Sequence, residues 1–253
     1  MALKIYIGNK NYSSWSLRPW LLMKQFGYVF DEIVVPVTGK GVHAGIQRDY
    51  SPSGLVPVLL ENDMQVWDSM AIAEYLAEKN PAMWPADSKS RSFARCVSYE
   101  MHSGFTDLRS EMPMNIKKRF VGKPISSNVS VNLNRIVSLW EQCRVEFGSK
   151  SENDRGYLFG EFSIADAMFA PIAWRFLTYN VVPESRISRK YLVTLLSNEY
   201  MREWEKDALL EDKEGSYPGP IPHYDNKSME LGGGVSREDS SNTVEGFTSL
   251  LMQ

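Results

Sequence analysis

Short apolar runs alternate with polar turns over the first part of the chain. Residues 3–8 and 30–35 are rich in β-branched and aromatic residues, which is typical of strands. The segment between them predicts a helix over residues 16–26, with Pro19 in its first turn, where a missing N–H costs nothing. Residues 36–53 are rich in glycine and other turn-forming residues, so any helix there must be short.

A second group of short elements follows. An apolar strand begins at Pro57, because proline cannot donate to a sheet ladder and belongs at the first residue of a strand or on an edge. A hairpin at 61–63 leads to another short strand that ends at Trp67. A helix over 69–78 then places its apolar side chains on one face. The order β-α-β-α-β-β-α predicts a mixed four-stranded sheet with helices on its faces.

The pattern changes after a short connector that contains Pro81 and Pro85. From Ser88 to Tyr200 the chain is almost wholly helical in character. Helices are expected near residues 88–118, 126–148, 163–180, 187–197 and 198–210. We therefore predict an α/β domain over residues 1–80 and an all-helical domain over residues 88–212.

The remaining segment, residues 213–253, has a different composition. It is rich in proline, glycine, serine, asparagine and acidic residues, and cannot bury enough apolar surface to offset its ordering entropy. A mostly disordered tail is predicted. Within it, Ile221–Tyr224 is a candidate docking segment, and the apolar end, Phe247–Met252, is a candidate for a weak contact.

The segment Ser163–Asp166 marks the start of a helix. The serine hydroxyl can accept a backbone N–H at the third helical position, and Asp166 can return the bond, as in a capping box. The helix that follows is apolar on nearly all sides, so it should be buried, and Pro171 should kink it. We interpret Ser163 and Asp166 as structural residues.

Composition narrows the possible partners. A net charge of −3 without a basic run argues against nucleic-acid binding. The two cysteines, Cys96 and Cys143, stand far apart without metal-like spacing, which indicates reduced thiols and no metal site. The N-terminus lacks the apolar core of a signal peptide, and no apolar run could span a membrane. A soluble cytoplasmic protein without membrane partners is expected.

Two residue pairs indicate a binding site. If the Val56–Pro57 peptide bond is cis, the backbone N–H and C=O of Val56 are left free for a partner. Asp68 and Ser69 bring a carboxylate, a hydroxyl and unpaired N–H groups together at a helix start, which suits a ligand with an amino-acid end. Together the pairs predict a site for a peptide-like small molecule. Asp68 and Ser69 could also be a helix cap alone.

These features in this order resemble the cytosolic glutathione transferase family over residues 3–210. The segment from Ser13 to Arg18, Ser-Ser-Trp-Ser-Leu-Arg, is similar to the zeta-class pattern Ser-Ser-Cys-Ser-Trp-Arg. That class has cysteine at the position of Trp15, and a Val-Arg pair after the segment, at the positions of Pro19 and Trp20. These departures argue against zeta-type isomerase chemistry. The resemblance implies a thioredoxin-like N-terminal domain, an all-helical C-terminal domain, and a serine-type, zeta-like branch of bacterial type.

The family's chemistry implies that glutathione is the co-substrate and that a serine hydroxyl stabilises its thiolate. Ser13 is the first candidate by the gapless match, and Ser14 is the second. A thiol with a pKa near 8.5 is only a few per cent thiolate at neutral pH. One charge-assisted hydrogen bond of roughly 1.5–3 kcal/mol can lower such a pKa by about one to two units. The alternative is that both serines are only cap and turn residues.

The resemblance also implies where glutathione lies. Val56, next to Pro57, would pair its backbone with the cysteinyl part, and Asp68 and Ser69 would hold the γ-glutamyl end. The glycyl carboxylate needs a donor, for which Lys40 and His43 are candidates. A pocket for a small, largely apolar electrophile should be lined by Tyr12, Trp15, Met101, Phe105 and Arg109. The last three fall on one face of the predicted helix, although such a stripe is more often core.

The resemblance is compatible with three functions. The first is a glutathione transferase with a detoxification-type conjugating activity, acting as a homodimer, as is usual in the family. The second is a non-catalytic binding module of the same fold, and the third is a glutathione-dependent isomerase. A thioredoxin-type oxidoreductase is disfavoured because residues 11–18 contain no cysteine. The serine pair and the Asp68–Ser69 pair favour the transferase.

Overall fold

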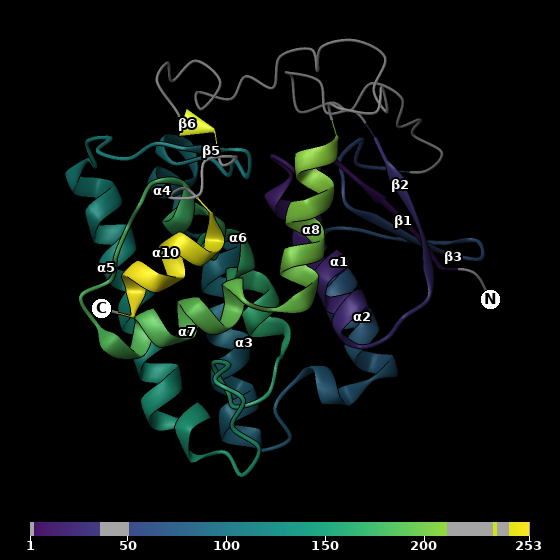
Figure 1. The fold of residues 1–253 in the computed structure, drawn as a ribbon. Helices are drawn as coiled ribbons and strands as arrows, with labels where there is room; N and C mark the ends of the chain where they lie inside the picture. Colours follow the sequence, from purple (N-terminus) through teal and green to yellow (C-terminus); the bar gives the residue numbers. More distant parts are fainter. Residues whose placement is uncertain (1–2, 36–50, 212–234, 237–242, 253) are drawn as a thin grey trace.

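The computed structural model describes residues 3–35, 51–211, 235–236 and 243–252. Figure 1 shows a small sheet domain beside a larger helical domain, with two helices of the sheet domain between the sheet and the helical domain. The predicted division into an α/β half and an all-helical half is confirmed.

The sheet consists of β1 (Leu3–Ile7), β2 (Phe30–Val34), β3 (Val58–Glu61) and β4 (Met64–Val66). Its strand order is β2-β1-β3-β4, with β2 parallel to β1 and the other neighbouring pairs antiparallel. This is the mixed four-stranded sheet that the sequence predicts. Helices α1 (Ser14–Gln25) and α2 (Ser69–Lys79) pack against each other, and α1 also packs against the helical domain. Helix α1 begins two residues before its predicted start at residue 16.

The helical domain is built around one buried helix, α6 (Ile164–Thr178), in which every residue is buried. The other helices are α3 (Ser88–Ser103), α4 (Thr106–Glu111), α5 (Ser127–Glu146), α7 (Arg186–Leu196) and α8 (Glu199–Leu210), with 3₁₀ turns η1 (Pro81–Met83) and η2 (Gly148–Lys150). Helix α6 contacts α1, α3 and α7, so it holds the two domains together. Pro171 lies inside α6, as predicted.

The start of α6 is fixed by Asp166. Its carboxylate accepts hydrogen bonds from the backbone N–H of Ser163 at 2.9 Å, the Ser163 hydroxyl at 3.0 Å and the backbone N–H of Leu158 at 3.0 Å. Burial raises the pKa of the Asp166 carboxyl to about 6, and the three hydrogen bonds act in the opposite direction. Ser163 and Asp166 therefore have the structural role that their spacing predicts.

The predicted single helix over residues 88–118 is wrong. Helix α3 ends at Ser103, and Phe105 adopts a left-handed conformation with φ of 61° before α4 begins. Gly104 precedes this reversal, where an added Cβ would lie 2.8 Å from the carbonyl oxygen of Glu100. The apolar period continues across the turn because both helices face the same core, so periodicity alone cannot reveal the break.

The predicted disordered tail is wrong for the two tail segments that the structure describes. Strand β6 (Val235–Ser236) pairs antiparallel with β5 (Lys118–Arg119), and helix α10 (Val244–Leu251) packs on α7 (Figure 1). Val244, Phe247 and Leu251 are buried in the main core. Their helical spacing forms an apolar stripe, which composition averaged over the tail conceals. The candidate docking segment Ile221–Tyr224 lies outside the described residues.

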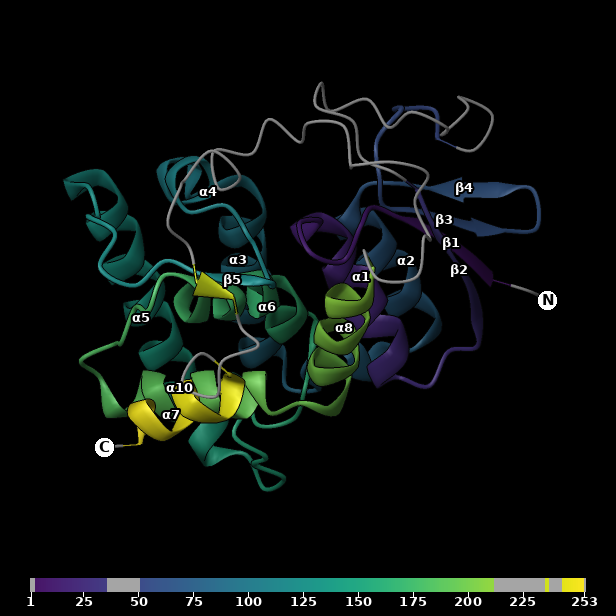
Figure 2. The same ribbon diagram turned by 45° about the horizontal axis from the view of Figure 1, so that its top comes forward.

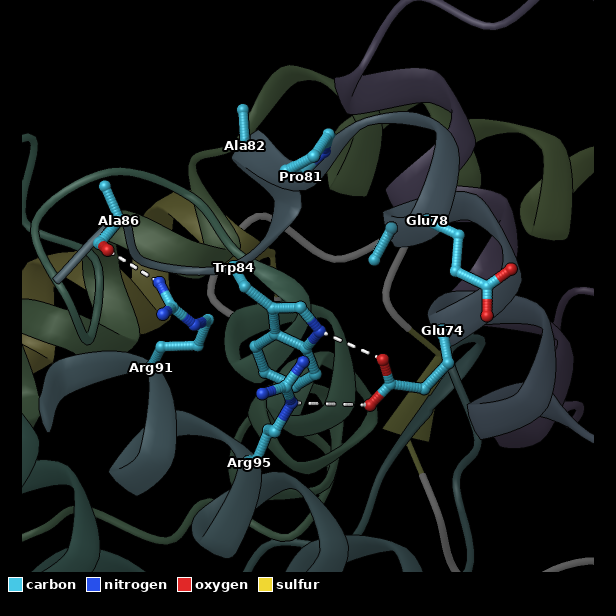
Figure 3. Close-up of a pocket in the computed structure, with 9 residues that line it drawn as sticks. Glu74, Glu78, Pro81, Ala82, Trp84, Ala86, Arg91 and Arg95 are labelled. Atoms are coloured by element: carbon cyan, nitrogen blue, oxygen red, sulfur yellow. Dashed lines mark hydrogen bonds and ion pairs between the residues drawn. The ribbon is translucent and has the colours of Figure 1, made fainter. Parts of the chain in front are cut away.

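The connection between the domains is tied to both of them. The Trp84 indole N–H donates to the Glu74 carboxylate of α2 at 3.2 Å, and the Arg95 guanidinium of α3 lies 3.8 Å from the same carboxylate. These three side chains line a groove beside η1 with a volume of about 520 Å³. Figure 3 shows their arrangement. The contacts join the connecting segment and the middle of α3 to α2.

The packing of α10 on α7 predicts that this helix contributes to stability. Replacing Phe247, which is 1% exposed, with alanine should lower the free energy of unfolding by about 3 kcal/mol, because a buried aromatic ring is lost. The matched control is Leu250→Ala, which shortens a side chain that is 39% exposed in the same helix and should cost less than half as much stability as Phe247→Ala. Urea unfolding measures both. Equal small effects would mean that α10 does not dock in solution.

Candidate functional site

Three chain segments of the N-terminal domain meet at one end of the sheet. Because β1 and β3 are antiparallel, Tyr6 near the end of β1 pairs with Val58 at the start of β3. Because β3 and β4 are antiparallel, Leu59 pairs with Val66 at the end of β4. The chain after β1, before β3 and after β4 is therefore gathered at this end. These three segments carry Ser13, Ser14, Val56, Pro57, Asp68 and Ser69.

The Ser13 hydroxyl is used within the domain. Its Oγ donates to the Ser16 Oγ at 2.7 Å, and Ser16 Oγ also accepts the backbone N–H of Gly8 at 3.0 Å. Ser13 occupies the N-cap position of α1 but its side chain makes no cap hydrogen bond. These contacts tie the loop after β1 to the first turn of α1 and commit the Ser13 proton to Ser16.

Ser14 is differently placed. It is the first residue of α1, where the positive end of the helix dipole favours negative charge. No hydrogen bond joins its hydroxyl to any residue of the described ranges. The side chains of Ser13 and Ser14 are buried to similar extents, with exposed fractions of 5% and 7%. Of the two, Ser14 therefore retains a proton that a ligand could accept.

The Val56–Pro57 peptide bond is cis, and it precedes β3 directly. The Val56 side chain is buried against Val35 and Tyr6, which fixes the residue in the domain. Its backbone N–H and C=O make no hydrogen bond with other described residues. Among the described residues, the Val56 backbone therefore has no hydrogen-bond partner, and it lies next to the end of β1.

Asp68 and Ser69 begin α2. Asp68 Oδ1 accepts the backbone N–H of Met70 at 2.9 Å and that of Ala71 at 3.3 Å, so Asp68 is the N-cap. Its other oxygen, Oδ2, lies 3.1 Å from Nε2 of His102 on α3. The Ser69 hydroxyl is fully buried and has no hydrogen-bond partner. A buried hydroxyl without a partner costs free energy, and a bound polar group would remove that cost.

Trp15 connects this end of the sheet to the helical domain. Its ring lies 5.3 Å from the ring of His102, in an edge-on arrangement. The guanidinium carbon of Arg18 lies 4.4 Å from the centre of the Trp15 ring, and that of Arg109 lies 4.6 Å from it. The indole is 36% exposed. The site is therefore bordered by α1 from one domain and by α3 and α4 from the other.

Burial in this region acts on the basic groups. It lowers the pKa of the His102 imidazole, against the opposing effect of the Asp68 carboxylate, so the ring is neutral at pH 7. It also lowers the pKa of Arg109 to about 10, which leaves that guanidinium charged.

The structure distributes the other predicted site residues unevenly. Met101 has no exposed surface and lies in the main core, and Phe105 is half-buried against that core. Because α3 ends between them, these two residues and Arg109 do not share one helix face, which corrects the prediction. Tyr12 is buried in the loop before α1. Lys40 and His43 lie outside the described residues.

Sequence reasoning missed two residues of the site. His102 is not marked by any motif of the sequence, yet it contacts both Asp68 and Trp15. Arg18 was used only as part of a motif, yet its side chain is almost fully buried. A charged residue among the apolar positions of a predicted helix was the available signal for Arg18.

Comparisons with known proteins agree with this architecture. Residues 12–79 match the family model described as the glutathione S-transferase N-terminal domain. A glutathione transferase homologue from Burkholderia, solved with bound glutathione, is 20% identical and superposes with a TM-score of 0.61, covering 83% of this chain and 99% of that chain. No curated protein matches the sequence significantly.

Two further structures are similar to a comparable extent. The theta-class glutathione S-transferase of Xanthomonas axonopodis, with glutathione bound, is 18% identical with a TM-score of 0.58, and the match covers 82% of this chain and 97% of that chain. The tau-class enzyme from mango is 15% identical with a TM-score of 0.62, covering 84% and 98%. The chain therefore has the glutathione transferase fold. Its residues 12–79 are similar to the N-terminal domain of glutathione S-transferases.

No group of three or more His, Cys, Asp or Glu residues within the described ranges could hold a metal ion. None of the helices in those ranges combines the length and apolar character that a membrane span requires.

Two variants of Asp68 separate the capping hydrogen bonds of this side chain from its negative charge. Asp68→Ala removes the acceptor of two helix N–H groups and should lower the free energy of unfolding by about 1 kcal/mol. Asp68→Asn keeps a good N-cap and should lie within about 0.5 kcal/mol of the wild type. Denaturant titration of both variants measures this. A larger loss for asparagine than for alanine would contradict the cap assignment.

Proposed function

We propose that the protein binds glutathione at this end of the sheet and transfers it to a small electrophile, as a serine-type glutathione transferase. The observation that carries the proposal is the Ser14 hydroxyl, which lies at the positive end of α1 without a hydrogen bond to any described residue. The family match over residues 12–79 and the glutathione bound in structures of the same fold support it.

The unsatisfied groups of the site match the parts of the tripeptide. The free backbone of Val56, beside cis-Pro57, would pair with the cysteinyl residue as an added strand. The buried Ser69 hydroxyl would bond to the γ-glutamyl carboxylate, and the Asp68 carboxylate would attract the ammonium group of the same residue. Lys40 and His43 remain candidates for the glycyl carboxylate.

In this proposal, the Ser14 hydroxyl activates the glutathione sulfur by donating a hydrogen bond to its thiolate. A hydroxyl that donates to a thiolate contributes about 1.5–3 kcal/mol, which lowers the thiol pKa by about one to two units. The helix dipole of α1 adds to this because its positive end faces the same region. Ser13 is the weaker candidate because its proton is already donated to Ser16.

The second substrate would lie beside Trp15, between the two domains. Tyr12 is close to Trp15 in the chain, and the Arg109 guanidinium lies against the Trp15 ring. Phe105 lies at the start of α4. The thiolate attacks the electrophilic carbon, a C–S bond forms, and the leaving group departs with the electron pair of the broken bond. The protein's part is to hold the two reactants together and to stabilise the thiolate.

We also propose that the protein is a cytoplasmic, two-fold symmetric homodimer of the zeta-like, bacterial-type branch with a role in detoxification. Light scattering of the purified chain tests the oligomeric state. Retention on immobilised glutathione, followed by an assay with 1-chloro-2,4-dinitrobenzene, tests the activity. Binding without turnover of this or other electrophiles would instead favour a non-catalytic binding module. Isomerisation of a cis double bond with no conjugation would favour an isomerase.

Two serine variants test the sulfur contact. Ser14→Ala should lower kcat by about 10- to 100-fold, because the hydrogen bond to the thiolate is lost, while the Kd of glutathione changes little. It should also raise the pKa of the bound thiol, which the thiolate absorbance measures during a pH titration. Ser13→Ala is the matched control and should have a smaller effect. The reverse order would assign the sulfur contact to Ser13.

An asparagine at position 68 tests the γ-glutamyl contact. Asp68→Asn keeps the cap but removes the negative charge that faces the ammonium group. The Kd of glutathione should rise about tenfold, which corresponds to about 1.4 kcal/mol. Isothermal titration calorimetry measures this change, and Asp87→Asn at the start of α3, another N-cap, serves as the control. An unchanged Kd would exclude Asp68 from the glutathione site.

A further inference from the structure

Two arginines, Arg18 and Arg109, lie close to the ring of Trp15. Arg18 comes from the next turn of α1, and Arg109 comes from α4 of the other domain. Their guanidinium carbons lie 4.4 Å and 4.6 Å from the centre of the ring. Stacking on an aromatic face suits a guanidinium group but leaves its N–H donors in need of acceptors.

Arg18 lacks such acceptors. Its side chain is buried, with 1% of its surface exposed, and its Nε and Nη1 atoms have no hydrogen-bond partner. No ion pair to a carboxylate is present for Arg18 within the described residues. A buried cation without a partner is strongly unfavourable, and proteins retain such groups where a ligand supplies the opposite charge.

The charges around Arg18 do not balance it. Arg109 and Arg175 both lower the pKa of Arg18 through repulsion, after burial itself, and only Asp68 acts in the opposite direction. The Asp68 carboxylate is already shared between the α2 cap and His102. Arg109 donates to the carbonyl oxygens of Gly104 and His102, which carry no net charge, and no ion pair joins Arg109 to a carboxylate of the described residues. The group keeps an excess of positive charge.

We propose that Arg18, supported by Arg109, binds a carboxylate group of the second substrate beside Trp15. This inference rests on the proposed function and narrows its substrate class to electrophiles that carry a carboxylate. A guanidinium matches a carboxylate in charge and geometry. The residues come from both domains, whereas the groups assigned to glutathione belong to the N-terminal domain. The carboxylate is therefore assigned to the electrophile and not to glutathione.

A pair of ligands that differ only in charge tests binding. Calorimetry on the glutathione-saturated protein compares 3-nitrobenzoate with 3-nitrobenzamide. The benzoate should bind at least about tenfold more tightly. Equal affinities would overturn the inference. This measurement requires no turnover, so it stands even if the protein proves to be a binding module.

A matched pair of substrates tests the same preference during reaction. With 4-fluoro-3-nitrobenzoate and 4-fluoro-3-nitrobenzamide, the glutathione thiolate forms a C–S bond at the ring carbon, the C–F bond breaks, and fluoride leaves with the electron pair. Each kcat/KM is divided by the rate constant of the uncatalysed reaction, because the two rings differ in reactivity. The benzoate-to-amide ratio of these values should be about ten or more and should fall about tenfold in Arg18→Met.

Two further variants complete the test. Arg109→Gln should also lower the ratio, and Arg95→Gln, which changes an exposed arginine of α3, should leave it unchanged. If circular dichroism shows that Arg18→Met is unfolded, the wild-type ratio and Arg109→Gln decide the question. A folded Arg18→Met with the wild-type ratio would overturn the inference.

The outcomes separate this inference from the proposed function. If Arg18→Met weakens glutathione binding about tenfold and slows both substrates equally, the carboxylate belongs to glutathione and the inference fails while the transferase stands. If the wild type binds glutathione and prefers the benzoate but conjugates neither substrate, the carboxylate site stands and the transferase proposal fails.

Discussion

The packing of α1 between the sheet and α6 is the constraint on which the candidate site depends. Helix α1 is buried along most of its length and contacts α2, α6 and α8. In the loop that precedes α1, the Lys10 amine lies 2.7 Å from the Glu32 carboxylate of β2 and 2.6 Å from the Asp207 carboxylate of α8, so this loop is tied to both domains. Figure 2 shows α1 between the sheet strands and the helical domain. Ser14, Trp15 and Arg18 therefore occupy fixed positions at the boundary between the domains.

Polar groups in the interior fall into two kinds. Asp166 and Lys10 are buried but fully engaged, and each joins segments that are distant in the chain. Ser69 and Arg18 are also buried, but atoms of both side chains lack partners. Burial without partners is unfavourable, and a bound polar ligand would remove that cost. Ser69 and Arg18 lie near the starts of α2 and α1, beside the proposed glutathione site.

The sequence predicted the mixed four-stranded sheet, the capped and buried α6, and the residues of the candidate site. These features depend on local rules, namely strand-initial proline, helix caps and apolar period. It failed at Gly104–Phe105, and it predicted only a weak contact of Phe247–Met252 where α10 docks into the core. In both places, the deciding factor is contact with a distant surface: α3 and α4 share one core, and Phe247 is buried in the core of the helical domain.

The sequence by itself determined the two-domain architecture and the segment that contains Ser13 and Ser14, because both follow from patterns within a few turns of the chain. The preference for Ser14 over Ser13 in our proposal comes from the structure, because the sequence does not show that Ser13 donates to Ser16. Only the tertiary structure brought Arg109 and His102 to Trp15, from a domain more than eighty residues away in the chain. Side-chain partners across a domain boundary depend on packing geometry, which local patterns do not encode.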